Sequence, residues 1–189
     1  MKEKYQGLVK KMLETGLVNQ EVYNRLVAVQ ESENWEMDEW DWLIETYYDD
    51  LDDTLINSLL EAAELAICYD AESSQVPPPY VNNMVPALLQ FAGLNKSDAE
   101  ISLDIKKKEV SKNEYTLIIK YKDREYHQSL EDFGDYYDTD GMLTILNDIL
   151  TNEGKEYILH ELSTSDQAFC FFKGDRMKLN AFIESCNQK

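Results

Sequence analysis

The hydrophobic residues change their period near Asn95, and this change constrains the fold more than any other feature of the sequence. Before this point they recur every three or four positions, as on one face of a helix. After it they alternate with polar residues, as in Ile101, Leu103 and Ile105, which is typical of a half-buried strand. The 189-residue chain therefore predicts an α+β fold with two regions, 1–95 and 96–189, which either form separate domains or pack as one unit.

The first region, 1–95, predicts helices throughout. Gly16 is expected to end the first helix as a left-handed cap. A later helical stripe is expected to continue through Ile67. The last helix of this region would begin near Asn83, so that Pro86 lies in its first turn, where a missing N–H leaves no hydrogen bond unmade.

The second region, 96–189, predicts the element order βββαββα, with about five mainly antiparallel strands in one sheet and two helices packed on it. Its first three strands follow one another through short turns, one of them at Lys122-Asp123. A helix at about 140–152 precedes two strands at 156–162 and 167–173, and a last helix follows them.

The charge is strongly acidic and unevenly distributed. The chain has 18 Lys and Arg against 37 Asp and Glu, a net charge of −19. Between Glu31 and Asn95 there are fifteen acidic residues and no Lys or Arg. This charge argues against nucleic acid and anionic membranes as direct partners, because both need a clustered basic surface. It favours a basic protein as the partner.

The cysteines and the apolar segments predict the compartment. Cys68, Cys170 and Cys186 form an odd set without CxxC spacing, so we expect free thiols, with neither a disulfide nor a metal site. No segment has the roughly 20 apolar residues of a spanning helix, and the N-terminus does not resemble a signal peptide. A cytoplasmic protein without cofactor or metal is therefore expected.

Two patterns in the second half could indicate an enzyme. The segment 135–141 resembles a calcium loop, but the first and the closing ligands of such a loop are missing. We therefore expect Thr139 or Asp140 to cap the following helix. Cys170 and His160 could pair as nucleophile and base, but Cys170 lies in an apolar run typical of an inert buried thiol.

No nucleophile elbow, phosphate-binding glycine loop or HExxH motif occurs, so the sequence predicts a protein that is not an enzyme. The alternative, from a different functional class, is a carboxylate- or metal-dependent enzyme that uses the acidic cluster Glu131–Asp140 together with His127 or His160. A cleft that holds these groups together would favour the enzyme.

The segment Glu31–Asp53 predicts a protein-binding surface, because it holds all three tryptophans among many carboxylates. On a helical wheel Trp40 belongs to the apolar stripe, whereas Trp35 and Trp42 lie on the opposite face. Aromatic anchors surrounded by acids suit a basic protein surface. The alternative is that another element of the chain covers these two rings. The predicted partner-binding residues are Trp35, Asp38, Trp42, Glu45, Asp49, Asp53, Asp135 and Asp138.

In these features the chain resembles the immunity proteins of bacterial toxin–immunity pairs, which are commonly small, acidic and without catalytic motifs. The residues that carry the resemblance are the segment Glu31–Asp53 with its three tryptophans, and the acids Glu131, Asp132, Asp135, Asp138 and Asp140. The resemblance implies an inhibitor that covers the basic active surface of a toxin, for example a nuclease. A scaffold or oligomerisation domain is the remaining alternative.

Overall fold

The computed structural model of the chain describes residues 2–31, 37–48, 51–70, 78–108, 112–131, 138–164 and 168–187. These residues form two compact units. Unit 1 comprises residues 1–69 and 162–189, and unit 2 comprises residues 70–161, so unit 2 is inserted between two segments of unit 1. The boundary predicted at 95/96 thus falls within unit 2.

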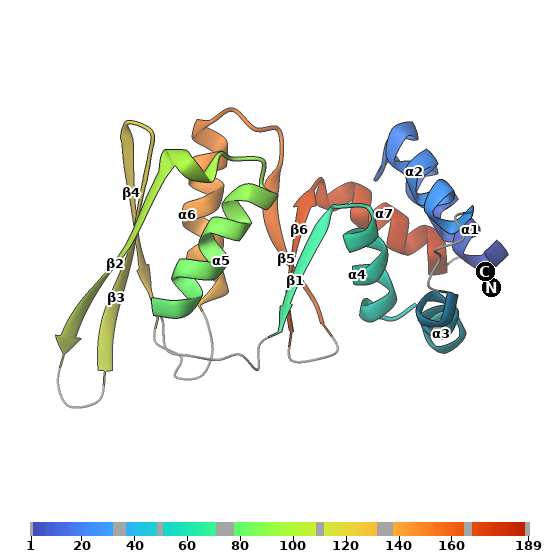
Figure 1. The fold of residues 1–189 in the computed structure, drawn as a ribbon, viewed down its shortest axis with the longest axis horizontal. Coiled ribbons are helices and arrows are strands. Elements are labelled where there is room, and N and C mark those ends of the chain that lie inside the picture. The colour runs from blue at the N-terminus through green and yellow to red at the C-terminus, as the bar shows by residue number, and fades with distance from the viewer. Residues whose placement is uncertain are drawn as a thin grey trace. The chain divides into compact units, whose positions relative to one another are not determined.

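Mixed helices and strands confirm the α+β class (Figure 1). In chain order the elements are α1 (Lys2–Glu14), α2 (Gln20–Glu31), α3 (Met37–Tyr47), α4 (Asp53–Ala62), β1 (Ala66–Asp70), α5 (Pro78–Phe91), the short 3-10 helix η2 (Lys96–Asp98), β2 (Ala99–Lys108), β3 (Lys112–Tyr121), β4 (Arg124–Leu130), α6 (Thr139–Asn152), β5 (Ile158–Leu162), β6 (Ala168–Gly174) and α7 (Arg176–Asn187). After residue 96 the order of strands and α-helices is the predicted βββαββα.

The strands form two sheets of three, with the orders β1-β6-β5 and β2-β3-β4. The prediction of one sheet of about five strands is therefore wrong. One strand, β1, lies in the region predicted to be all helical, and it pairs with β6. Alternation along a strand identifies the strand but does not determine its neighbours, which depend on long-range packing.

The end of α4 explains why β1 was missed. The N–H of Glu64 donates to the carbonyl of Glu61, and the N–H of Leu65 donates to that of Leu60, which is the Schellman pattern. Its left-handed residue is Glu64, with φ of 58°, where glycine is usual. The predicted helix therefore ran on through Ile67, because no glycine marked its end.

A cap of the same type at Gly16 follows the prediction. Gly16 has φ of 68° and donates to the carbonyl of Leu13, while Leu17 donates to that of Met12, so Gly16 ends α1 as expected. Pro86 does not follow its prediction. Helix α5 begins at Pro78, which places Pro86 inside the helix rather than in its first turn.

Each unit has its own hydrophobic core. In unit 1 the core joins side chains from both chain segments, including Leu59 from the first and Phe172 and Phe182 from the second, all three fully buried. In unit 2 helices α5 and α6 pack on the sheet β2-β3-β4 (Figure 1). The sheet is antiparallel and turns at Lys122-Asp123 as predicted. Leu117 and Ile119 are buried, and the alternate residues of the sheet lie nearer the solvent.

Candidate interaction surface

Helix α3 places two tryptophans in different environments. Trp40 is half-buried and packs on the core of unit 1, where its ring meets the ring of Tyr5 edge-on with centroids 5.1 Å apart. Trp42 is 54% exposed. Leu43 and Ile44 are buried in the same core. The helical-wheel prediction, with Trp40 towards the core and Trp42 towards the solvent, is therefore confirmed.

The indole of Trp42 has an aromatic neighbour that limits its orientations. The ring of Tyr47 meets it edge-on, with centroids 5.6 Å apart and an interplanar angle of 86°. Such a pair contributes about 0.5–1.5 kcal/mol beyond the burial of its area. Tyr47 is half-buried and packs against the core of unit 1, so a residue anchored in the core also contacts the exposed tryptophan.

Two acids accompany Trp42 on α3. Glu45 is exposed and lies three residues further along the helix, which places it on the same face as Trp42. Asp41 is half-buried and directly precedes Trp42. We call Asp41, Trp42 and Glu45 the α3 surface. Asp41 was not among the predicted site residues, and only its position in the acidic segment indicated it.

Apart from Asp138, which is described below, the remaining predicted residues divide into three groups. Asp53 is half-buried at the first position of α4. Asp38 lies in α3, but its side chain is outside the described part of the structure. Trp35, Asp49 and Asp135 lie outside the described residues, so their role in partner binding stays a prediction.

Several acids of the segment 31–95 have structural partners. The carboxylate of Asp52 caps α4 by accepting a hydrogen bond of 2.8 Å from the N–H of Thr54. Glu61 accepts one of 3.0 Å from the N–H of Cys68. Glu64 forms an ion pair with Arg25 of α2, a base from outside the acidic segment. Part of the acidic excess is thus explained by the fold itself.

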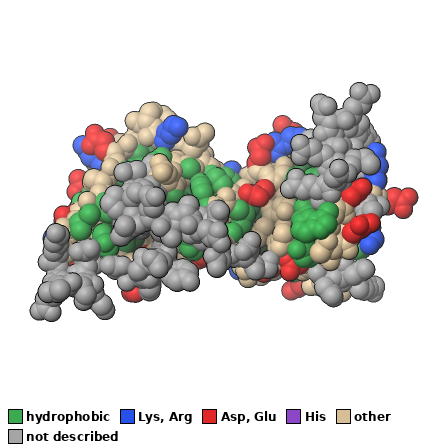
Figure 2. All heavy atoms as spheres, turned by 60° about the horizontal axis from the view of Figure 1, so that its bottom comes forward, with side chains coloured by type: hydrophobic (Ala, Val, Ile, Leu, Met, Phe, Trp, Pro, Cys, Tyr) green, Lys and Arg blue, Asp and Glu red, His purple; other side chains and the backbone are tan. Residues whose placement is uncertain are grey.

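The acids of the α3 surface differ from these. In the part of the chain that the structure describes, no Lys or Arg forms an ion pair with Asp41 or Glu45. Figure 2 shows acidic and hydrophobic side chains near each other on the visible face of unit 1, at the right of the view. An exposed aromatic ring beside unneutralised carboxylates is able to bind a cationic group through its face and through charge.

Asp138 has a structural role in unit 2. Its buried carboxylate accepts hydrogen bonds of 2.8 Å from the N–H of Gly141 and from the N–H of Glu131. It is the N-cap of α6, so the predicted caps, Thr139 or Asp140, are wrong by one or two positions. A Cβ at residue 141 would lie 2.6 Å from Asp138 Oδ2, which explains the glycine there. With both oxygens engaged by the backbone, Asp138 is not an exposed partner-binding residue.

The acidic cluster Glu131–Asp140 of the alternative enzyme site lies partly outside the described residues, because residues 132–137 are not among them. His127 lies on the exposed side of β4, with its Nε2 2.7 Å from Glu125 Oε1. Asp140 is exposed, whereas Asp138 is buried as the cap. Among the residues that the structure describes, no group of three or more His, Cys, Asp or Glu side chains could hold a metal ion.

The cysteines differ from the prediction. Cys68 of β1 and Cys170 of β6 form a disulfide, and only Cys186 is a free thiol. The expectation of three free thiols is therefore wrong, as is the view of Cys170 as an inert thiol or a nucleophile. Their distance in sequence, 102 residues, gave no sign that adjacent strands would bring them together. Within the described residues every helix is too short or too polar to cross a membrane.

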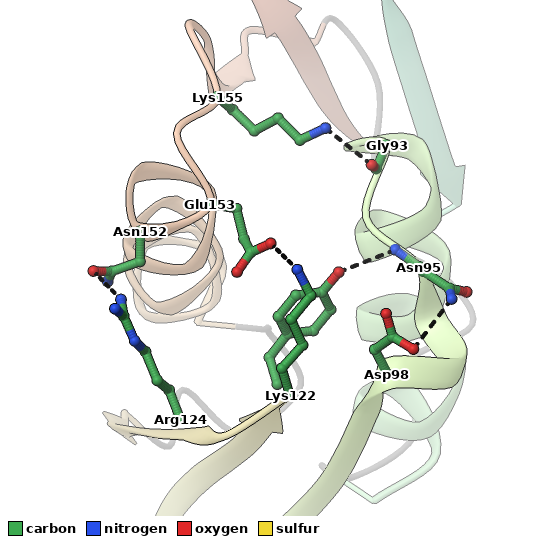
Figure 3. Close-up of polar contacts among 9 residues, drawn as sticks. Gly93, Asn95, Asp98, Lys122, Arg124, Asn152, Glu153 and Lys155 are labelled. Carbon is green, nitrogen blue, oxygen red and sulfur yellow. Dashed lines mark hydrogen bonds and ion pairs between the residues drawn. The ribbon is translucent and has the colours of Figure 1, made fainter.

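The basic residues near the helix ends of unit 2 are engaged within that unit (Figure 3). Lys155 donates a hydrogen bond of 3.2 Å to the carbonyl of Gly93, just beyond α5. Lys122 pairs with Glu153 at the end of α6, and this hydrogen bond raises the pKa of Lys122. Cations at helix C-termini complement the helix dipole. These bases therefore have structural partners, in contrast to the acids of the α3 surface.

Comparisons with protein-family models, with curated proteins and with solved structures give no match for this chain.

Proposed function

We propose that the protein is a non-catalytic binding protein whose α3 surface recognises a basic protein, in the manner of a toxin immunity protein. The observation that supports this proposal is the exposure of Trp42, at 54%, next to carboxylates that have no basic partner among the described residues. Large aromatic residues contribute most of the affinity at many interfaces, and surrounding charges select the partner.

Inhibition would follow from occupation of the basic surface. Asp41 and Glu45 would pair with Lys or Arg side chains that the partner otherwise uses to hold a phosphate-bearing substrate. Trp42 would pack against an apolar or cationic group of the partner that lies between those basic side chains. A net charge of −19 would also accelerate the encounter with a basic partner, and salt would screen this attraction.

The proposal does not depend on a cytoplasmic location. Disulfides are rare in reducing compartments and persist in oxidising ones, so the Cys68–Cys170 bond disfavours the compartment expected from the sequence.

Affinity capture at low salt tests the proposal, with the full chain as bait and mass spectrometry of the retained proteins. The baits are the wild type, Trp42→Ala, Glu45→Lys and the control Glu156→Lys, which makes the same charge change at an exposed site of unit 2. We expect one basic protein to be retained by the wild type and the control and to be lost from the two α3-surface variants.

The retained protein is then purified and its affinity measured. Trp42→Ala should weaken binding about 30-fold, equivalent to about 2 kcal/mol, as for a central aromatic anchor. Affinity for the wild type should fall as salt rises from 50 to 500 mM in the assay buffer, an increase that shortens the Debye length to well below about 10 Å. Retention of the same protein by all four baits, or an affinity that does not change with salt, would contradict the proposal. Capture of the chain by itself would instead support the scaffold alternative.

A further inference from the structure

Unit 1 is assembled from two chain segments that are far apart in sequence. Helices α1 to α4 and strand β1 come before unit 2, and strand β6 and helix α7 come after it. The two segments share one core, since Phe172 and Phe182 pack in the same cluster as Leu55 and Leu59. Helices α1 to α4 also pack on one another within the first segment, but the packing of β6 and α7 onto them depends on contacts between segments that the chain connects only through unit 2.

Polar contacts also join the segments, in addition to the hydrogen bonds between the paired strands β1 and β6. The ammonium of Lys11 on α1 donates a hydrogen bond of 2.7 Å to the carbonyl of Ser185 on α7. The N–H of Lys173 donates one of 2.8 Å to the carbonyl of Leu65, just before β1. The side chain of Asn57 donates one of 3.1 Å to the carbonyl of Ser163.

The Cys68–Cys170 disulfide is the covalent link between the same two segments. Cys68 lies in β1, and Cys170 lies in the adjacent strand β6 with its Cα 4.1 Å away. The bond closes a loop of 102 residues that contains the whole of unit 2. Closing a long loop removes much conformational freedom from the unfolded chain, so the stabilisation that it provides is expected to be large.

We propose that the Cys68–Cys170 pair is a redox switch that determines whether unit 1 stays folded. The proposal deepens, and rests on, the proposed function, because it makes the α3 surface of unit 1 dependent on the oxidised state. The co-reactant is a protein or small-molecule dithiol. One of its thiolates attacks Sγ of the half-buried Cys68 and expels the Cys170 thiolate, which takes up a proton. The second thiol then attacks the mixed disulfide, releases Cys68 as a thiol and leaves the reductant oxidised to its own disulfide.

The geometry favours attack at Cys68, because Cys170 is only 2% exposed. The third cysteine is a poor competitor. Burial raises the pKa of the Cys186 thiol, so little of it is thiolate at neutral pH. Exchange within the chain is therefore disfavoured, and the pair Cys68–Cys170 responds to external dithiols as a unit.

Tryptophan fluorescence provides a probe that is specific for unit 1, since all three tryptophans lie in its first segment. Thermal melts of the full chain are recorded with and without dithiothreitol. We expect reduction to lower the fluorescence midpoint by about 10–20 °C. Cys68→Ala without reductant should melt like the reduced wild type. The control Cys186→Ser should keep the full difference between the two conditions.

A digest without reductant, with alkylation of free thiols, provides an independent readout that does not require the variants to fold. It should show Cys68 and Cys170 in one linked peptide pair and only Cys186 alkylated. Three alkylated cysteines, or equal fluorescence midpoints with and without dithiothreitol, would overturn the switch. Neither result involves a partner, so the proposed function would stand or fall separately in the capture experiment.

Discussion

Helix α3 allows a direct comparison of two tryptophans two residues apart. We expect Trp40→Ala to lower the free energy of unfolding of unit 1 by about 3 kcal/mol, the low end for deletion of a large core ring. The low end applies because Trp40 is half-buried. Its edge-on contact with Tyr5, at 5.1 Å between centroids, is lost as well.

Trp42→Ala should have a smaller effect, about 1 kcal/mol or less. The ring is 54% exposed, and its aromatic contact is with the half-buried Tyr47. The loss of this pair is partly offset because alanine favours the helix by about 0.5 kcal/mol relative to tryptophan. The two variants should therefore differ by about 2 kcal/mol, which is about 10 °C in the melting temperature of a domain of this size.

Urea unfolding, followed by the fluorescence of the remaining tryptophans, measures this difference in unit 1. Trp40→Phe is the control, because phenylalanine keeps an aromatic ring for Tyr5 and should restore part of the lost stability. If Trp42→Ala unfolds as readily as Trp40→Ala, Trp42 is a core residue, and the α3 surface as defined here is wrong.

Two further predictions concern single side chains. Asp138→Ala removes the acceptor of two backbone N–H groups, those of Gly141 and Glu131. It should lower the unfolding free energy of unit 2 by about 2 kcal/mol, as measured by urea unfolding followed by circular dichroism. Asp138→Asn should lower it by less. Burial raises the pKa of Tyr5 to about 12, above its ordinary value of 10.0. The folded state thus retains this proton when the unfolded chain loses it, and stability should fall between pH 10 and 12 by about 2–3 kcal/mol. In Tyr5→Phe this component of the alkaline loss should be absent, and an unchanged pH dependence would contradict the burial argument.

Local features that sequence encodes directly were predicted well. Gly16 ends α1, and the turn at Lys122-Asp123 joins β3 and β4, because both conformations depend on a few neighbouring residues. The opposite environments of Trp40 and Trp42 follow from the helical period alone.

Features that depend on distant residues were not predicted. Glu64 adopts a left-handed conformation that its residue type does not signal, so the strand β1 behind it was read as helix. Asp138 looked like a surface acid, and only the approach of the Glu131 backbone shows why its carboxylate is buried. Asp138 is a residue type favoured at N-caps, but the sequence alone did not distinguish it from its neighbours Thr139 and Asp140.

By itself, the sequence determined the α+β class, the order of strands and helices after residue 96, and the acidic character of the helical region. The tertiary structure decided which strands share a sheet, that unit 2 interrupts unit 1, and that Cys68 and Cys170 are bonded. The physical reason is that periodicity and caps act over a few residues, whereas strand pairing and disulfide formation are selected by packing between segments about a hundred residues apart.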